Sequence, residues 1–100
     1  MLPDGLLNIV KQYMSLTWLD GATDARLQLI IQNGIVDLDE KSGVKNNYVV
    51  SGRAQSLLLI RTMYEWSNAL DDFYTNYKKE IVAFINMAKV NAYVNEQTSN

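Results

Sequence analysis

The sequence contains no cysteine and no histidine in its 100 residues. Without cysteine the chain forms no disulfide and offers no thiolate as a metal ligand or nucleophile. Without histidine it lacks the side chain most often used as a general base and as a ligand of transition metals. Ser-His and Cys-His catalysis are therefore impossible, and a zinc or iron site is almost excluded. We predict no catalytic, cofactor-binding or metal-binding residues, and a protein that is not an enzyme.

Positive charge and long apolar runs are also scarce. The chain has 9 basic and 11 acidic residues, and neither half carries a net positive charge. Such a chain has little general attraction for a phosphate backbone, so sequence-specific binding of duplex DNA is disfavoured. No apolar run approaches the length of about eighteen residues that spans a bilayer, so we predict no membrane segment.

Apolar residues recur with helical spacing through most of the chain. The i, i+3, i+4, i+7 pattern predicts helices over about 4–15, 23–38, 51–70 and 73–93. Asp4, Ser51 and either Asp20 or Thr23 are the expected N-caps, and the Asp71-Asp72 pair is expected at the last break. The predicted fold is all-α: a compact bundle of about four helices, with a long loop at 39–50 between the second and third. We expect one domain over 1–95 and a frayed tail over 96–100.

Gly34 interrupts the apolar stripe of the second predicted helix. Glycine costs about 1 kcal/mol relative to alanine inside a helix. The favoured interpretation is that another helix crosses closely at this point; the alternative is a kink.

Half of the ten aromatic residues lie between 64 and 81. Tyr64, Trp66, Phe73 and Tyr77 extend apolar stripes and are most simply core. Tyr74 lies off these stripes, and the third helix has two stripes, more than one neighbouring helix covers. Exposed aromatic surface of this kind is typical of protein interfaces. Tyr74, together with Trp66 at the second stripe of the third helix, is therefore assigned to a predicted protein interface.

The carboxylate clusters suggest little chemistry. DLDEKSG, at 37–43, has some similarity to a calcium loop, but Lys41 occupies a ligand position and Ser42 replaces the turn glycine. No glycine-rich phosphate-binding motif is present. The chain therefore has the features of a protein that another protein covers.

Two segments together resemble the small all-helical head–tail connector proteins of tailed bacteriophages, also called head-completion or adaptor proteins. The first has Asp20 and Asp24 ahead of apolar helical positions and closes on Asp37-Leu38-Asp39 and a glycine. The second is R-x-x-Y-x-x-x-x-A-L-x-x-F-x-x-x-Y-x-x-E-I, which begins at Arg61. Together they cover about residues 5–85; Trp66 and the Gly34 interruption depart from the pattern.

The resemblance implies a structural virion protein of the head–tail junction, made in the bacterial cytoplasm and functioning in virion assembly and DNA packaging. It implies a homo-oligomeric ring that docks on the portal protein. The far side of the ring would bind a tail or stopper protein, and duplex DNA would pass through the lumen without specific contact. Flexible segments often become ordered when they bind a partner protein. The 39–50 loop and the C-terminal part are therefore expected to contribute to protein interfaces. The residues assigned there are Glu40, Lys41, Val44, Tyr48 and Tyr93.

Two other functional classes remain open at this stage. A small helical interaction or regulatory module would bind a partner protein without belonging to a particle. A nucleic-acid binder would show salt-sensitive retardation of duplex DNA.

Overall fold

The computed structural model describes residues 2–15 and 21–98, with the side chains of 22 and 92–98 left out of the description. The described residues form five helices: α1 (Leu6–Tyr13), α2 (Gly21–Ser42), α3 (Arg53–Trp66), α4 (Leu70–Asn76) and α5 (Lys78–Thr98). No strand occurs in these residues. The predicted all-α class is confirmed, with five helices in place of about four.

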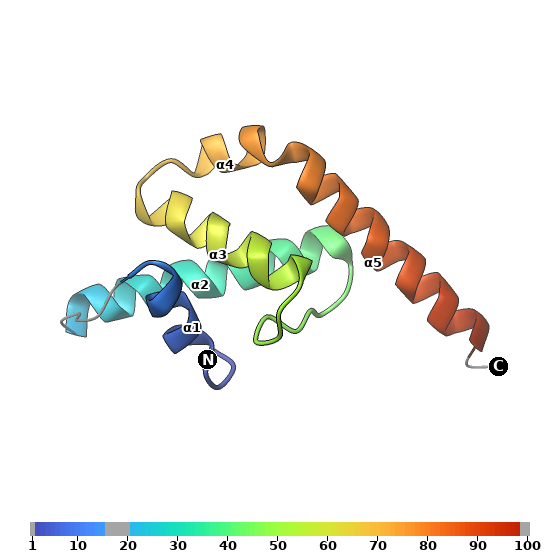
Figure 1. Cartoon of the computed structure of the whole chain (residues 1–100), viewed down its shortest axis with the longest axis horizontal. Helices are drawn as coiled ribbons and strands as arrows, with labels where there is room; N and C mark the ends of the chain where they lie inside the picture. Colours follow the sequence, from blue (N-terminus) through green and yellow to red (C-terminus); the bar gives the residue numbers. More distant parts are fainter. Residues whose placement is uncertain (1, 16–20, 99–100) are drawn as a thin grey trace.

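Helices α2 and α3 run side by side in opposite directions and form the centre of the molecule (Figure 1). The chain reverses after α3, so that α4 packs against α3. Helix α5 begins against α2, α3 and α4 and then extends away from them toward the C-terminus (Figure 1). The molecule measures 50 × 30 × 18 Å, because the second half of α5 projects from the body.

The core consists of apolar side chains from every helix and from the segment between α2 and α3. Phe73, a predicted core residue, has no exposed surface. It packs against the rings of Tyr64, Tyr74 and Tyr77, with centroid distances of 6.1, 5.3 and 5.7 Å. The buried apolar residues are Leu6, Val10, Leu27, Ile30, Ile31, Leu38, Tyr48, Leu57, Leu58, Leu59, Phe73, Ile81 and Phe84.

Gly34 lies at a close approach between α2 and α3. A Cβ added at Gly34 would lie 2.7 Å from Cδ1 of Leu58 and 3.3 Å from Nη1 of Arg61, both on α3. A hydrogen atom in place of a methyl group is therefore what allows the two helices to cross here. The predicted close helix crossing is confirmed.

Several predicted helix ends are wrong. Gly5 and Gly52 occupy the N-cap positions of α1 and α3, and neither helix has a side-chain cap hydrogen bond, so Asp4 and Ser51 do not cap them. Asp20 lies outside the described residues. Helix α2 continues through Ser42, so residues 39–42 are helical and residues 43–52 connect α2 to α3.

The fourth predicted helix is two helices, α4 and α5, separated at Tyr77. The break after α3 comes earlier than the Asp71-Asp72 pair, at 67–69, where Asn68 adopts a positive φ of 60°. The amide of Ala69 donates to the carbonyl of Tyr64 at 2.8 Å and closes this turn. The two aspartates lie in the first turn of α4, where negative charge is favoured by the helix dipole.

Candidate functional site

Asp37 of α2 is the centre of a polar cluster that joins three helices. Its Oδ2 accepts a hydrogen bond from Tyr74 Oη of α4 at 2.6 Å and another from Arg61 Nε of α3 at 3.1 Å. Its Oδ1 pairs with Lys41 Nζ, one turn along α2, at 2.6 Å. Both carboxylate oxygens are therefore engaged, and each bond comes from a different residue.

Arg61 is the most deeply buried charged side chain of the cluster. Its side chain is 6% exposed, and its Nη1 donates to Glu65 Oε1 at 2.7 Å while its Nε contacts Asp37. A guanidinium out of water is tolerated only where carboxylates neutralise it and accept its protons. Asp37 and Glu65 supply those two carboxylates.

The cluster holds Asp37 in its ionised form. Partial burial opposes ionisation, but hydrogen bonds from Lys41 and Tyr74 and the charges of Lys41 and Arg61 outweigh it, so the pKa of Asp37 lies below its ordinary value. Burial and the hydrogen bond to Asp37 raise the pKa of the Tyr74 hydroxyl. Asp37 is therefore a poor general base and Tyr74 a poor acid. The arrangement is typical of a structural contact that holds helices together.

Tyr74, a predicted interface residue, makes several contacts inside the subunit. Its ring is half-buried against Phe73, its hydroxyl is bonded to Asp37, and the ammonium of Lys41 lies 5.1 Å from its ring centroid. Tyr74 and Lys41 thus serve contacts inside the subunit. Trp66, also half-buried, accepts a hydrogen bond at its carbonyl from Arg26 at 3.2 Å, and the guanidinium lies 4.6 Å from its ring centroid.

Tyr48, another predicted interface residue, also makes contacts inside the subunit. It is 1% exposed, and its hydroxyl donates to Asp39 Oδ1 at 2.7 Å. Asn46 Nδ2 donates to the same oxygen at 2.9 Å. Burial, followed by the bond to Asp39, raises the pKa of Tyr48. These contacts fasten the 43–52 segment to the end of α2.

The remaining predicted interface residues differ in position. Glu40 is exposed on α2, and Val44 is half-buried just after it. Tyr93 lies in the part of α5 whose side chains are outside the description. Glu40 and Lys41 are therefore the predicted interface residues whose side chains are exposed in the structure.

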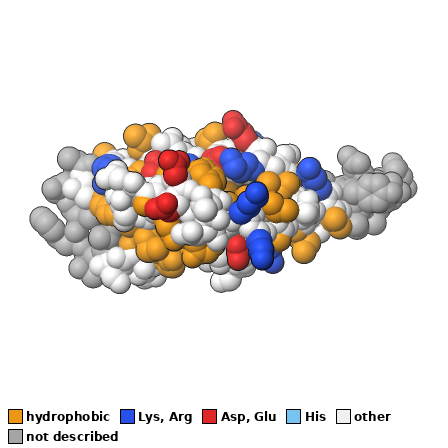
Figure 2. Space-filling view, turned by 90° about the horizontal axis from the view of Figure 1, so that it is seen from above, with side chains coloured by type: hydrophobic (Ala, Val, Ile, Leu, Met, Phe, Trp, Pro, Cys, Tyr) orange, Lys and Arg blue, Asp and Glu red, His pale blue; other side chains and the backbone are white. Residues whose placement is uncertain are grey.

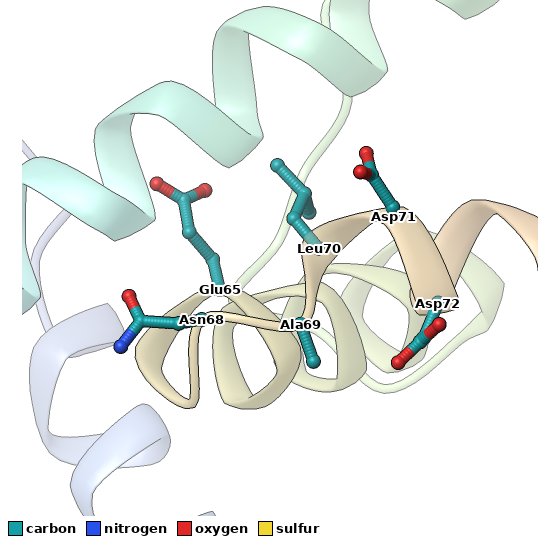
Figure 3. A pocket seen from close by; sticks show the side chains of 6 residues that line it. All are labelled: Glu65, Asn68, Ala69, Leu70, Asp71 and Asp72. Carbon is teal, nitrogen blue, oxygen red and sulfur yellow. The ribbon is translucent and has the colours of Figure 1, made fainter.

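A hollow between the end of α3 and the start of α4 is lined by Glu65, Asn68, Ala69, Leu70, Asp71 and Asp72. Its three carboxylates do not converge: Glu65 points toward α2, and Asp71 and Asp72 point away from each other (Figure 3). No group of three acidic side chains in the described residues is arranged to hold a metal ion. No described helix is long and apolar enough to cross a membrane.

A stripe of exposed side chains runs along α2 on the side opposite its buried residues. Leu29 is 62% exposed and Val36 is 47% exposed. Positions three or four apart share one helix face, and every member of this series is exposed. The α2 stripe consists of Ala25, Leu29, Asn33, Val36 and Glu40.

A second exposed stripe runs along the outer side of α5. Val82 and Val90 are 47% and 57% exposed, and Met87 beside them is 54% exposed. Figure 2 shows hydrophobic side chains interspersed with lysine and arginine side chains toward the end where α5 extends. The α5 stripe consists of Lys79, Val82, Asn86 and Val90.

Sequence reasoning missed both stripes and the Asp37–Arg61 pair. On α2 and α5 only the buried apolar series was followed, although the outward series of α2 has the same spacing. Arg61 gave a weaker signal: a single arginine within an apolar stretch, followed four residues later by an acid. Its partner across the helix crossing could not be assigned from spacing alone.

In comparisons with known proteins, no family model, curated protein or solved structure matches this chain.

Proposed function

We propose that this chain is a structural subunit that assembles into a ring at the head–tail junction of a tailed bacteriophage. The ring docks on the portal protein, presents its other side to a tail or stopper protein, and lets duplex DNA pass through its lumen. The all-helical fold is consistent with this proposal, and the resemblance in the two segments described above motivates it.

The observation that carries the proposal is the pair of uncovered stripes on α2 and α5. A single domain has no structural need for exposed Leu29 and Val36 on one helix together with Val82 and Val90 on another. Large apolar side chains gathered in this way mark surfaces that other molecules cover. Two different surfaces on one subunit are what a head-to-tail contact requires, and such a contact closes into a ring when its rotation permits.

The charge of the chain suits a conduit for DNA. The formal net charge is −2, so a lumen lined by this protein has little general attraction for phosphate and lets the duplex slide. Passage without a specific contact requires only that the wall does not hold the polymer.

Sedimentation velocity and negative-stain electron microscopy of the full chain test the proposal. The protein is examined alone over a range of concentrations, and together with the portal protein encoded nearest to its gene. We expect ring-sized assemblies with a central hole, either alone or on the portal. A protein that stays monomeric or dimeric throughout and does not bind the portal contradicts the proposal.

A small interaction module is the second candidate, because the same stripes could receive one cellular partner. Neighbouring genes separate the two functions: terminase, portal and capsid genes next to this one support the connector, and their absence supports the module.

A further inference from the structure

We infer that the α5 stripe of one copy packs antiparallel against the α2 stripe of the next copy. The inference deepens the proposed function and rests on its premise of self-assembly, because it names the surfaces through which the subunits meet. Three members of the α5 stripe, Lys79, Val82 and Asn86, line a hollow together with Lys78 and Ala83.

The two stripes match in spacing when one of them is reversed. From Lys79 the α5 stripe has members at 0, 3, 7 and 11 residues, and from Glu40 the α2 stripe, read backwards, has members at 0, 4, 7, 11 and 15, so that Ala25 lies beyond the matched levels. At a rise of about 1.5 Å per residue the four matched levels extend roughly 16 Å on both helices. Helices joined in this register therefore keep their side chains in step along the whole contact.

The two stripes also match in chemistry at each level. Lys79 of one copy faces Glu40 of the other at one end of the contact. Neither side chain has an ion pair within the described part of the chain, whose pairs all involve other residues. Opposite charges at the rim of an interface fix its register and orientation more than they add affinity.

At the remaining levels apolar side chains face apolar side chains, and amide side chains face amide side chains. Val82 faces Val36, which covers two side chains that are about half exposed in the single subunit. At the far end Val90 meets Leu29, whose 62% exposure is the largest among the exposed apolar side chains of the described residues.

The central level pairs Asn86 with Asn33, both exposed. Two side-chain amides can donate to and accept from each other. A single polar pair within an apolar helix contact specifies one register and disfavours shifted alternatives.

A second copy fits this surface better than a membrane or a nucleic acid does. Helix α5 has three lysines, Lys78, Lys79 and Lys89, fewer than the clusters of about four to eight cations by which a helix binds an anionic membrane. It also has the α2 stripe as a complement in every subunit. Because the two stripes lie on different helices, each subunit can use both at once.

Cysteine cross-linking tests the register directly, since the natural chain has no cysteine. A Val36→Cys chain is mixed with a mass-tagged Val82→Cys chain under mild oxidation, and heterodimers are counted by mass spectrometry. Mixing single-cysteine chains restricts the counted bond to a contact between copies. We expect Val36→Cys with Val82→Cys to cross-link at least tenfold faster than Leu29→Cys with Val82→Cys, which the register places about two turns apart.

Charge reversal supplies an independent test in the cysteine-free chain. Glu40→Lys and Lys79→Glu should each weaken self-association about threefold to tenfold, and the double variant should restore it. The matched control is Glu40→Lys with Lys78→Glu, which has the same charges with one cation moved about 100° around α5, and it should not restore association. Equal cross-linking of the matched and shifted cysteine pairs, or no restoration in the double variant, overturns the inference.

The same reagents separate this inference from the proposed function. A chain with both Val36→Cys and Val82→Cys should give a ladder of covalent multimers if subunits follow one another around a ring. If it gives covalent dimers alone while the heterodimer test succeeds, the α2–α5 contact stands and the ring is contradicted. If rings form but the register tests fail, the function stands and this interface is overturned.

Discussion

The hydroxyl of Tyr74 on α4 donates a 2.6 Å hydrogen bond to the carboxylate of Asp37 on α2, although the two residues are 37 positions apart. Helix α4 has only seven residues, too few to be stable alone. Its position therefore depends on tertiary contacts. The Phe73 ring contributes apolar burial, and the directional hydrogen bond of the Tyr74 hydroxyl fixes the orientation of α4.

Replacing Tyr74 by phenylalanine should destabilise the subunit by about 1–2 kcal/mol, because a hydrogen bond to a charged acceptor is lost while the ring remains. Chemical denaturation at neutral pH measures the change. Tyr13→Phe is the control, since Tyr13 is an exposed tyrosine of α1 and should change the unfolding free energy little. Equal effects of the two substitutions would mean that the Asp37 bond contributes nothing.

Replacing Tyr48 by phenylalanine should cost a similar amount, about 1–2 kcal/mol. Tyr48 is almost fully buried, and its hydroxyl donates to Asp39, so the substitution removes one of the bonds that satisfy a partly buried carboxylate. Hydrogen exchange should also accelerate in residues 43–52, because the bond fastens this segment to α2. Unchanged exchange there would show that the apolar ring alone holds the segment.

Gly34→Ala should destabilise the subunit by about 1 kcal/mol, although alanine is the better helix former. The added methyl group meets Leu58 Cδ1 at 2.7 Å, and Leu58 is fully buried, so the overpacking cost of about 1–3 kcal/mol exceeds the propensity gain of about 1 kcal/mol.

A double-mutant cycle isolates the cause at Gly34. Leu58→Val removes the atom in conflict, so Gly34→Ala should cost less in that background than in the natural chain. Gly21→Ala is a control, because a Cβ at Gly21 meets nothing within 4 Å. Stabilisation by Gly34→Ala in the natural chain would contradict the close crossing.

The sequence predicted the parts of the fold that depend on local periodicity. The all-α class, the core position of Phe73 and the close crossing at Gly34 follow from the spacing of apolar residues and from the cost of a helical glycine. Helix ends at 5, 52 and 67–69 were missed, because glycine N-caps and a positive-φ asparagine leave weak signals next to better capping residues.

The contacts of Tyr74 and Tyr48 inside the subunit were missed for one common reason. Tyr74 lies off the apolar stripes and Tyr48 lies in a predicted loop, and both positions suggested exposed side chains. Their hydroxyls instead reach Asp37 and Asp39, two carboxylates of α2. The spacing of apolar residues along one helix does not indicate a hydrogen bond between polar groups on two different elements.

Acid should destabilise the subunit partly through Asp37, whose pKa is lower in the folded chain than its ordinary value. Between the folded pKa and the unfolded value of about 4, the unfolded state binds more protons, so stability rises with pH in this window. The contribution is present above the unfolded pKa and is lost as pH falls through the folded pKa. Urea unfolding between pH 3 and pH 7 measures it.

The Lys41 ammonium is the strongest single cause that lowers the pKa of Asp37, so removing it should flatten this pH dependence. Lys41→Met should lose less stability between pH 5 and pH 3 than the natural chain does, while Lys45→Met, with the same loss of charge in the 43–52 segment, should not share the effect. Some acid dependence should persist in Lys41→Met, because the hydrogen bond from Lys11 lowers the pKa of Asp24 as well. If Lys41→Met and Lys45→Met flatten the profile equally, the effect comes from net charge and the Asp37 cluster is not its source.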